Sequence, residues 1–251
     1  MKSTAPKRIA TARSRSNTRD ADRVYDDLRA RILALQLTPG SVLDESRVVA
    51  DLGISRTPVR EAVIRLVSDG LLQRDGRQVR VAAFEVSELR AFFEGLTLLS
   101  RAIHRAAAVR RSPTQLRAIQ EALHRFENEL AQGDEVRISE ANHAFHEAVS
   151  VAAQSEYIHR AYQALLVQSL RLARQCFAAG DELEAAQRSH LDRTAADHRQ
   201  LYHAIEKRDA EGADQIAHRH SQLFRERLNR QILGSVGTIE SMNLGELDAL
   251  N

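Results

Sequence analysis

Residues 53–63 read GISRTPVREAV, and this stretch decides the fold of the first third of the chain. Gly53 ends a short predicted helix, because glycine readily takes the backbone conformation that stops one. The next helix opens at Thr57-Pro58, with Thr57 as the candidate N-cap and Pro58 in the first turn. A helix, a tight turn and a second helix are therefore predicted over residues 45–70.

The flanking sequence extends this unit in both directions. Residues 23–36 predict a helix. Downstream, two short runs at 71–74 and 78–81 enclose Asp75-Gly76-Arg77, a turn typical of a β-hairpin. Helix, helix, turn, helix and hairpin in this order are the plan of a winged helix-turn-helix. The apolar face of the first helix comprises Val24, Leu28, Ile32 and Leu35.

The helix after the turn carries the donors that reading DNA requires. A recognition helix enters the major groove at its N-terminal end, and Arg56 and Arg60 are four residues apart there. An arginine that makes a bidentate pair of hydrogen bonds to one guanine contributes about 1–3 kcal/mol of discrimination against the other bases. Arg8 and Arg13, in the basic arm, are expected to contact phosphates. The predicted DNA face comprises Arg47, Ser55, Arg56, Thr57, Arg60, Gly76 and Arg77.

Charge and composition agree with a nucleic-acid partner for the first part only. Residues 1–84 hold 16 Lys and Arg against 10 Asp and Glu, whereas residues 85–251 hold 20 against 24. The single cysteine, Cys176, excludes an internal disulfide and a four-thiolate zinc site, and fits a reducing compartment. No apolar run approaches the roughly 18 residues that span a bilayer. We expect a cytoplasmic protein that does not associate with membranes.

The fold class predicted is mainly α, with a winged helix-turn-helix followed by an all-α bundle of six or seven helices. Residues 1–21 are predicted as a basic flexible arm, 22–84 as the winged domain, 85–233 as the helical domain and 234–251 as a tail. The helices of the second domain are expected at about 86–110, 113–132, 135–153, 155–178, 187–207 and 210–232.

The second domain also holds the histidines, since all ten lie beyond residue 100. Asn142, His146, His198 and His220 fall on or beside the apolar faces of three predicted helices. Buried polar groups need partners. A metal ion would satisfy these four, and the four-residue spacing of Asn142 and His146 converges on one point. Hydrogen-bonded core histidines are the alternative interpretation.

Residues 24–82 resemble the GntR family of bacterial repressors, above all in the stretch from Gly53 to Ala62 followed by Leu66 and Asp69-Gly70-Leu71. The resemblance implies that the protein binds a double-stranded DNA operator. We expect a homodimer held mainly by residues 85–232, because an isolated winged domain makes too few contacts for tight specific binding and paired half-sites correct that. The resemblance also implies which side chains contact the operator: Arg56, Thr57, Arg60 and Gly76.

Residues 85–232 resemble the FCD ligand-binding domain of FadR-type members, including the shorter VanR-like version. Its metal pattern is matched by Asn142, His146, His198 and His220, with Asn142 where an Asp is usual. The resemblance implies a divalent metal, Zn, Ni or Mn, beside a small-molecule effector, with an organic acid as the candidate class. The position of the usual carboxylate-binding Arg holds Leu96. The candidate effector pocket is Leu96, Ser100, Arg101 and His104.

The function predicted is therefore an effector-controlled transcriptional regulator, expected to be a repressor and not an enzyme. A metal-dependent hydrolase fused to a DNA-binding module is one alternative. Against it, His146-Glu147 begins an H-E-x-x-H pattern whose second His is missing, because position 150 is Ser. An architectural DNA-binding dimer without an effector is the other alternative.

Overall fold

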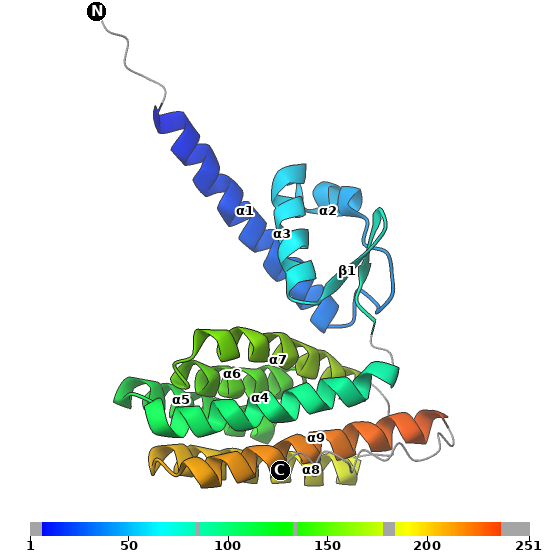
Figure 1. Cartoon of the computed structure of the whole chain (residues 1–251). Coiled ribbons are helices and arrows are strands. Elements are labelled where there is room, and N and C mark those ends of the chain that lie inside the picture. The colour runs from blue at the N-terminus through cyan, green and yellow to red at the C-terminus, as the bar shows by residue number, and fades with distance from the viewer. Residues whose placement is uncertain (1–6, 84–85, 133–134, 178–183, 237–251) are drawn as a thin grey trace, which may run out of the picture. The chain divides into compact units, whose positions relative to one another are not determined.

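The structure, a computed structural model, describes residues 7–83, 86–132, 135–177 and 184–236. The chain divides into two compact units, Met1–Phe84 and Glu85–Asn251, which we describe one at a time (Figure 1). The fold is mainly α, as predicted: in the described part, helices account for all regular structure except one two-stranded sheet. None of the described helices combines the length and the apolar character that crossing a bilayer would require.

The first helix of the first unit, α1 (Lys7–Leu33), is longer than expected. The sequence predicted that this helix starts at residue 23 and that residues 1–21 form a flexible arm. Residues 7–22 contain neither Gly nor Pro, so nothing in them interrupts a helix that the core holds further along. Arg8 and Arg13 accordingly lie on α1.

The helix-turn-helix is built as the local sequence dictates. Helix α2 (Glu45–Leu52) ends at Gly53, whose left-handed φ of 63° lets the chain turn. Helix α3 (Arg56–Ser68) follows at once. Its N-cap is Ser55, one residue before the helix, so Thr57 lies in the first turn and is not the cap that the sequence predicted.

The core of the first unit lies between α1 and α3. Val24 and Leu28 are fully buried on α1, as are Val63 and Leu66 on α3. Leu35, predicted on the same stripe, lies beyond the end of α1 and is half-buried.

Three side-chain contacts connect α3, together with Asp69 at its end, to α1. Tyr25 donates a 2.6 Å hydrogen bond from its hydroxyl to Asp69. Arg65 lies over the ring of Tyr25 at 4.3 Å and contacts Asp22 at 2.6 Å. Burial and the bond to Asp69 raise the pKa of Tyr25 to about 12, so its hydroxyl stays a donor. The position of α3 is therefore braced by contacts remote from its exposed N-terminal end.

The predicted hairpin forms from β1 (Leu72–Asp75) and β2 (Gln78–Val81). The strands pair antiparallel, with Leu72 opposite Val81, and Gly76 takes a φ of 58° in the turn. Residues 40–43 run along the other edge of β2 and form backbone hydrogen bonds with it. For example, the amide of Leu43 donates to the carbonyl of Val79 at 2.8 Å. The hairpin is thus anchored at its base while its turn stays exposed.

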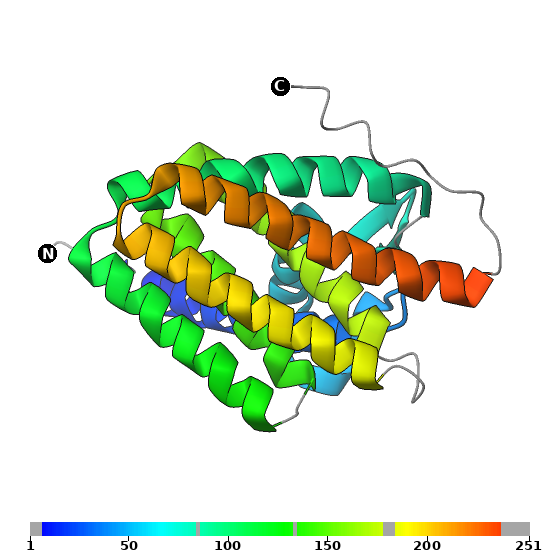
Figure 2. The ribbon, with the colours of Figure 1, turned by 90° about the horizontal axis from the view of Figure 1, so that it is seen from below.

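The second unit is a bundle in which α4 lies beside α9, α9 beside α8, and α5 along α6 (Figure 2). A single 3-10 turn, η1 (Val86–Glu88), precedes α4. Helix α9 continues three residues into the segment predicted as a tail, and the rest of that segment lies outside the described residues. The helices are α4 (Leu89–Arg110), α5 (Pro113–Gln132), α6 (Glu135–Ala152), α7 (Glu156–Phe177), α8 (Glu184–Glu206) and α9 (Ala210–Val236).

Candidate functional site

The exposed end of α3 carries the donors that the sequence singled out. Ser55, Arg56, Thr57 and Arg60 are all exposed, while Pro58 and Val59 between them face the core. Neither arginine has a carboxylate partner within the described part of the chain. Two guanidinium groups are therefore presented from one helix end without competing ion pairs, which suits contacts to base edges.

The remaining predicted DNA-contacting residues are also exposed. Arg47 on α2 is 79% exposed and lies 3.7 Å from Asp51, a loose surface pair. Gly76 and Arg77 form the turn between the strands and are exposed as well. A Cβ at Gly76 would meet no atom, so its positive φ, and not crowding, favours glycine there.

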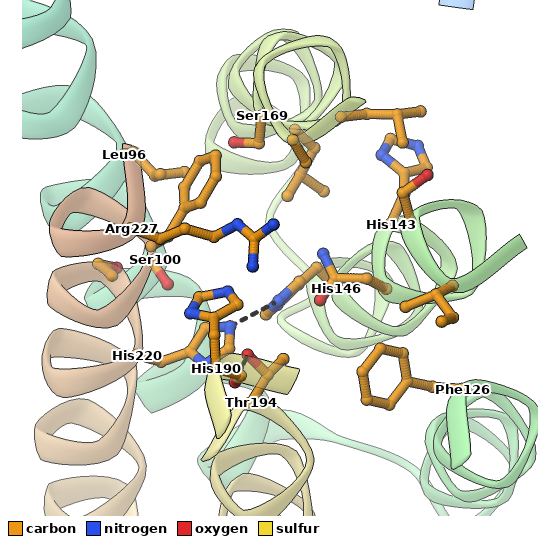
Figure 3. A pocket seen from close by; sticks show the side chains of 18 of the residues that line it. Leu96, Ser100, Phe126, His143, His146, Ser169, His190, Thr194, His220 and Arg227 are labelled. Atoms are coloured by element: carbon orange, nitrogen blue, oxygen red, sulfur yellow. Dashed lines mark hydrogen bonds between the residues drawn. The ribbon is translucent and has the colours of Figure 1, made fainter. Parts of the chain in front are cut away.

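In the second unit, three histidines from three helices meet in the interior. His146 on α6, His198 on α8 and His220 on α9 place one ring nitrogen each within 4.8 Å of the others. The Nε2 atoms of His146 and His220 face each other at 3.2 Å, drawn as the dashed line in Figure 3. His198 is fully buried and stacks on the ring of Phe145 at 4.2 Å. Residues separated by up to 74 positions thus converge on one point.

This geometry fits a metal ion. Two nitrogens bound at about 2.0–2.1 Å to one tetrahedral ion lie about 3.3 Å apart, close to the 3.2 Å seen between His146 and His220. Neither ring nitrogen of His198 has a hydrogen-bond partner in the described part of the protein. A buried imidazole with both nitrogens unsatisfied is costly, and ligation would satisfy one of them.

The electrostatics favour the ligating form of these side chains. Burial, and next the neighbouring imidazoles, hold the pKa of His146 well below the ordinary value. The pKa of His198 is lowered in the same way. Neutral imidazole is the form that binds metal, so these residues are in that form at neutral pH.

A carboxylate behind the cluster lies close to one of the three. Oδ2 of Asp197 lies 3.4 Å from Nδ1 of His220, within ion-pair distance. Arg219 donates two bonds to Oδ1 of the same carboxylate, at 3.0 and 2.6 Å. Burial alone would raise the pKa of Asp197, but the contacts with His220 and Arg219 outweigh it and lower the pKa. An anion beside Nδ1 leaves Nε2 of His220 directed at His146.

A cavity adjoins the cluster and is lined by residues from all six helices of the second unit. It offers about 90 Å³ to the centres of water-sized molecules, whereas one water needs about 10–15 Å³. His146 and His220 line it, and so does Asn142, the predicted fourth ligand. The space therefore suits a small organic molecule beside the histidines.

The structure separates the four residues predicted for the effector pocket. Leu96 and Ser100 line the cavity, but Arg101 and His104 are absent from its lining. Arg101 instead binds both carboxylate oxygens of Asp214, through Nε at 3.1 Å and Nη2 at 2.9 Å. His104 is fully buried, with Nδ1 2.7 Å from the carbonyl of Ser100.

Several polar residues of the lining were not predicted from the sequence, among them His190, Tyr162 and Arg227. Helical spacing carried a signal for two of them. His190 lies eight residues before His198, and Arg227 seven after His220, so each repeats the face of a predicted ligand two turns away. Burial, and next the charge of Arg227, lower the pKa of His190 to about 3.

Two family models match the chain. Residues 20–80 match "Bacterial regulatory proteins, gntR family", and residues 91–223 match "FCD domain". Together they cover both structural units.

Individual relatives agree. A "Probable D-xylose utilization operon transcriptional repressor" of Paenarthrobacter nicotinovorans is 29% identical over 221 residues, 84% of this chain and 89% of its own. An uncharacterized HTH-type transcriptional regulator of Streptomyces ambofaciens is 45% identical over 65 residues, 26% of each chain. The solved structure of E. coli McbR/YncC has a TM-score of 0.71 at 23% identity, covering 85% of this chain and 98% of that one, and so shares the fold.

Proposed function

The chain belongs to the GntR family of bacterial regulatory proteins and carries its FCD domain, and from this premise we propose that it is a cytoplasmic repressor controlled by a small-molecule effector. Regulation of transcription follows from the family itself. The observation that carries the control by an effector is the cavity beside three convergent histidines in the second unit. The name of the Paenarthrobacter relative supports repression as the direction of control.

In the proposed complex, Arg56 and Arg60 contact base edges in the major groove, and Ser55 and Thr57 contact phosphates or thymine methyl groups. Arg47 and Arg77 add phosphate contacts from α2 and the hairpin turn. Their common exposure supports this assignment.

The metal site is proposed at His146, His198 and His220, with the amide of Asn142 as a fourth, weak ligand. When bound, a divalent ion such as Zn, Ni or Mn would supply a Lewis-acid contact to the effector. The three imidazoles would hold it, and Asp197 would orient His220. An ion held by three imidazoles and one neutral amide would keep a coordination position for an oxygen atom of the effector.

Replacing Asp197 with Asn is expected to weaken metal binding by about 10- to 100-fold, because the ring of His220 loses the anion that sets its orientation. Chelator competition measures the affinity, and the visible absorption of the Co²⁺ form reports the ligand geometry. Asp192→Asn is the matched control, since Asp192 is exposed on the same helix. Equal metal affinity and equal Co²⁺ spectra in both variants would remove Asp197 from the site.

We propose that an effector in the cavity acts on the DNA-binding unit through α4. This helix follows the hairpin after a short link, and its Leu96 and Ser100 line the cavity. An effector can change operator affinity only to the extent that it binds one arrangement of the two units better than another. Contacts between the effector and α4 would supply this difference in affinity if α4 shifts relative to α9.

The functional proposal is tested by selecting binding sites from random DNA with the full chain. A homodimer is expected to enrich a two-fold symmetric sequence whose half-sites lie about one helical turn apart. Light scattering should give twice the chain mass of 28.1 kDa. Enrichment of no sequence contradicts the regulator, and a monomer on a single half-site contradicts the dimer.

The dimer is proposed to use the exposed face of α4, where Leu98 and Val109 are both 57% exposed and share one side of the helix. Leu98→Glu is expected to shift the mass toward that of the monomer, because a charge would be buried in the interface. Tyr157→Glu, at an 89% exposed position on α7, is the control. If Tyr157→Glu dissociates the dimer and Leu98→Glu does not, the interface lies on α7 and not on α4.

A further inference from the structure

A fourth buried imidazole, that of His104 on α4, lies against the three convergent histidines. Its ring packs edge-on against the ring of His146 from α6, with the ring centres 5.7 Å apart. The side chain is fully buried. His146 and His220 line the cavity, but His104 does not belong to the lining that the described residues form. Any effect of His104 on the site must therefore pass through the side chains that it contacts.

The one proton of the His104 ring is on Nδ1. This atom lies 2.7 Å from the carbonyl oxygen of Ser100, which can only accept a hydrogen bond. Burial lowers the pKa of His104 to about 4, so the ring is neutral at pH 7 and has a single N–H. Nε2 is then an acceptor. It is buried without a hydrogen-bond partner in the described part of the protein, and a buried acceptor needs a donor.

His146 offers the matching donor. Its Nε2 faces Nε2 of His220 at 3.2 Å, so Nε2 is the atom directed at the proposed metal position. A neutral imidazole that binds metal through Nε2 carries its proton on Nδ1, and the partner of that N–H fixes the orientation of the ring. Nδ1 of His146 is also buried, and no described residue forms a hydrogen bond with it.

We propose that Nε2 of His104 accepts a hydrogen bond from Nδ1 of His146, and that this bond holds His146 in the tautomer and ring orientation that bind metal. The proposal rests on the proposed metal site. His104 is a positioning residue in this arrangement, since it reaches the ion only through His146. It would serve His146 as Asp197 would serve His220.

The bond would also connect the metal site with α4, the helix that follows the hairpin. Ser100 on α4 holds the His104 ring through its carbonyl, lines the cavity, and forms a side-chain hydrogen bond with Tyr162 from α7. The ring of His104 is therefore fixed at a position that two further helices determine. A molecule in the cavity that contacts Ser100 would lie one residue away from the support of a metal ligand.

Two substitutions separate the acceptor from the bulk of the ring. His104→Leu removes the acceptor, whereas His104→Gln keeps an amide at the end of the side chain that can accept in place of Nε2. We expect His104→Leu to weaken Zn²⁺ binding by about 10- to 100-fold in chelator competition, and His104→Gln to retain most of the affinity. His159→Leu is the matched control, because His159 bonds to Ser150 at 2.9 Å and is not one of the convergent histidines.

The hydrogen bond itself is measured in the side-chain ¹⁵N spectrum of the histidines, on metal-free and Zn²⁺-loaded wild type. We expect the proton of His146 on Nδ1 in both forms, with a coupling across the bond to Nε2 of His104. The signals that disappear in His104→Gln assign the ring of His104. This measurement decides the question even if His104→Leu does not fold, which melting curves of the metal-free variants establish.

Several results would overturn the inference. One is a His146 ring that is protonated on Nε2 or bonded elsewhere in the metal-free spectrum, and another is equal Zn²⁺ affinity in wild type and a folded His104→Leu. An equal loss in His104→Leu and His104→Gln, with the Co²⁺ absorption changed in both, would make His104 a direct ligand instead. Wild type that binds no metal would refute the metal site and reduce the bond to a core contact, so metal content and the metal-free spectrum distinguish the two failures.

Discussion

Replacing Arg60 with Ala is expected to weaken binding to the selected operator by about 1–3 kcal/mol, a loss of roughly 5- to 150-fold. The side chain is exposed on the first turns of α3. Removing a two-pronged contact to a base edge also relaxes the sequence preference at that base pair. Arg56→Ala should behave similarly, and the double variant should approach the affinity for non-specific DNA.

The control for Arg60→Ala is Arg160→Ala, which removes the same charge from an exposed position of the second unit. Its affinity should remain within about twofold of wild type, since distant charges are screened at physiological salt. Binding titrations at two salt concentrations, on the selected operator and on one substituted at each half-site base, measure both effects. An Arg60→Ala protein with wild-type affinity and base preference would show that α3 is not the recognition helix.

Replacing His198 or His220 with Ala is expected to reduce bound metal from about one ion per chain to background. Each substitution removes one of three imidazole ligands, and the fourth is a weak amide. At a metal concentration 1,000 times the Kd, wild type gains about 4.1 kcal/mol of stability from binding, which the variants lose. Elemental analysis of untagged protein and melting curves with and without metal provide the two measurements.

His198→Ala also leaves a hole in a packed core, so part of its destabilisation is independent of metal. Comparing melting curves of the metal-free proteins isolates that part. His203→Ala is the control, because His203 lies on the same helix with its side chain 61% exposed. Equal metal content in wild type, His198→Ala and His220→Ala would identify these residues as ordinary core histidines. The winged unit should still bind DNA in both variants.

The candidate metal ligands show which features of a site the spacing of residues in the sequence can predict. Asn142 and His146 are one helical turn apart, so any α-helix brings them to one face. His198 and His220 lie on other helices, and their apolar neighbours in the sequence indicated that they point inward. That three inward histidines approach within 4.8 Å of one another depends on how α6, α8 and α9 cross. Spacing made this convergence plausible, and the packing of the helices produces it.

The sequence by itself determined the local features, which depend only on residues that are neighbours in the chain. The turn at Gly53, the exposed arginines at the start of α3 and the hairpin around Gly76 depend on backbone preferences and local periodicity. The predicted start of α1 was wrong, because the helix begins at Lys7 and not at residue 23. A basic, polar segment without an apolar stripe can continue a helix whose later turns pack in the core.

Only the tertiary structure decided which cation faces the cavity. Arg101 and Arg227 are both arginines on amphipathic helices. The spacing of Arg227 from His220 indicates a shared helix face, but it does not show which of the two cations lines the cavity. Asp214, 113 residues beyond Arg101, binds that guanidinium, while Arg227 is directed inward (Figure 3). Side-chain charge is a property of the sequence, but its partner is set by helix rotation and packing. The lining of the cavity therefore could not be assigned from sequence alone.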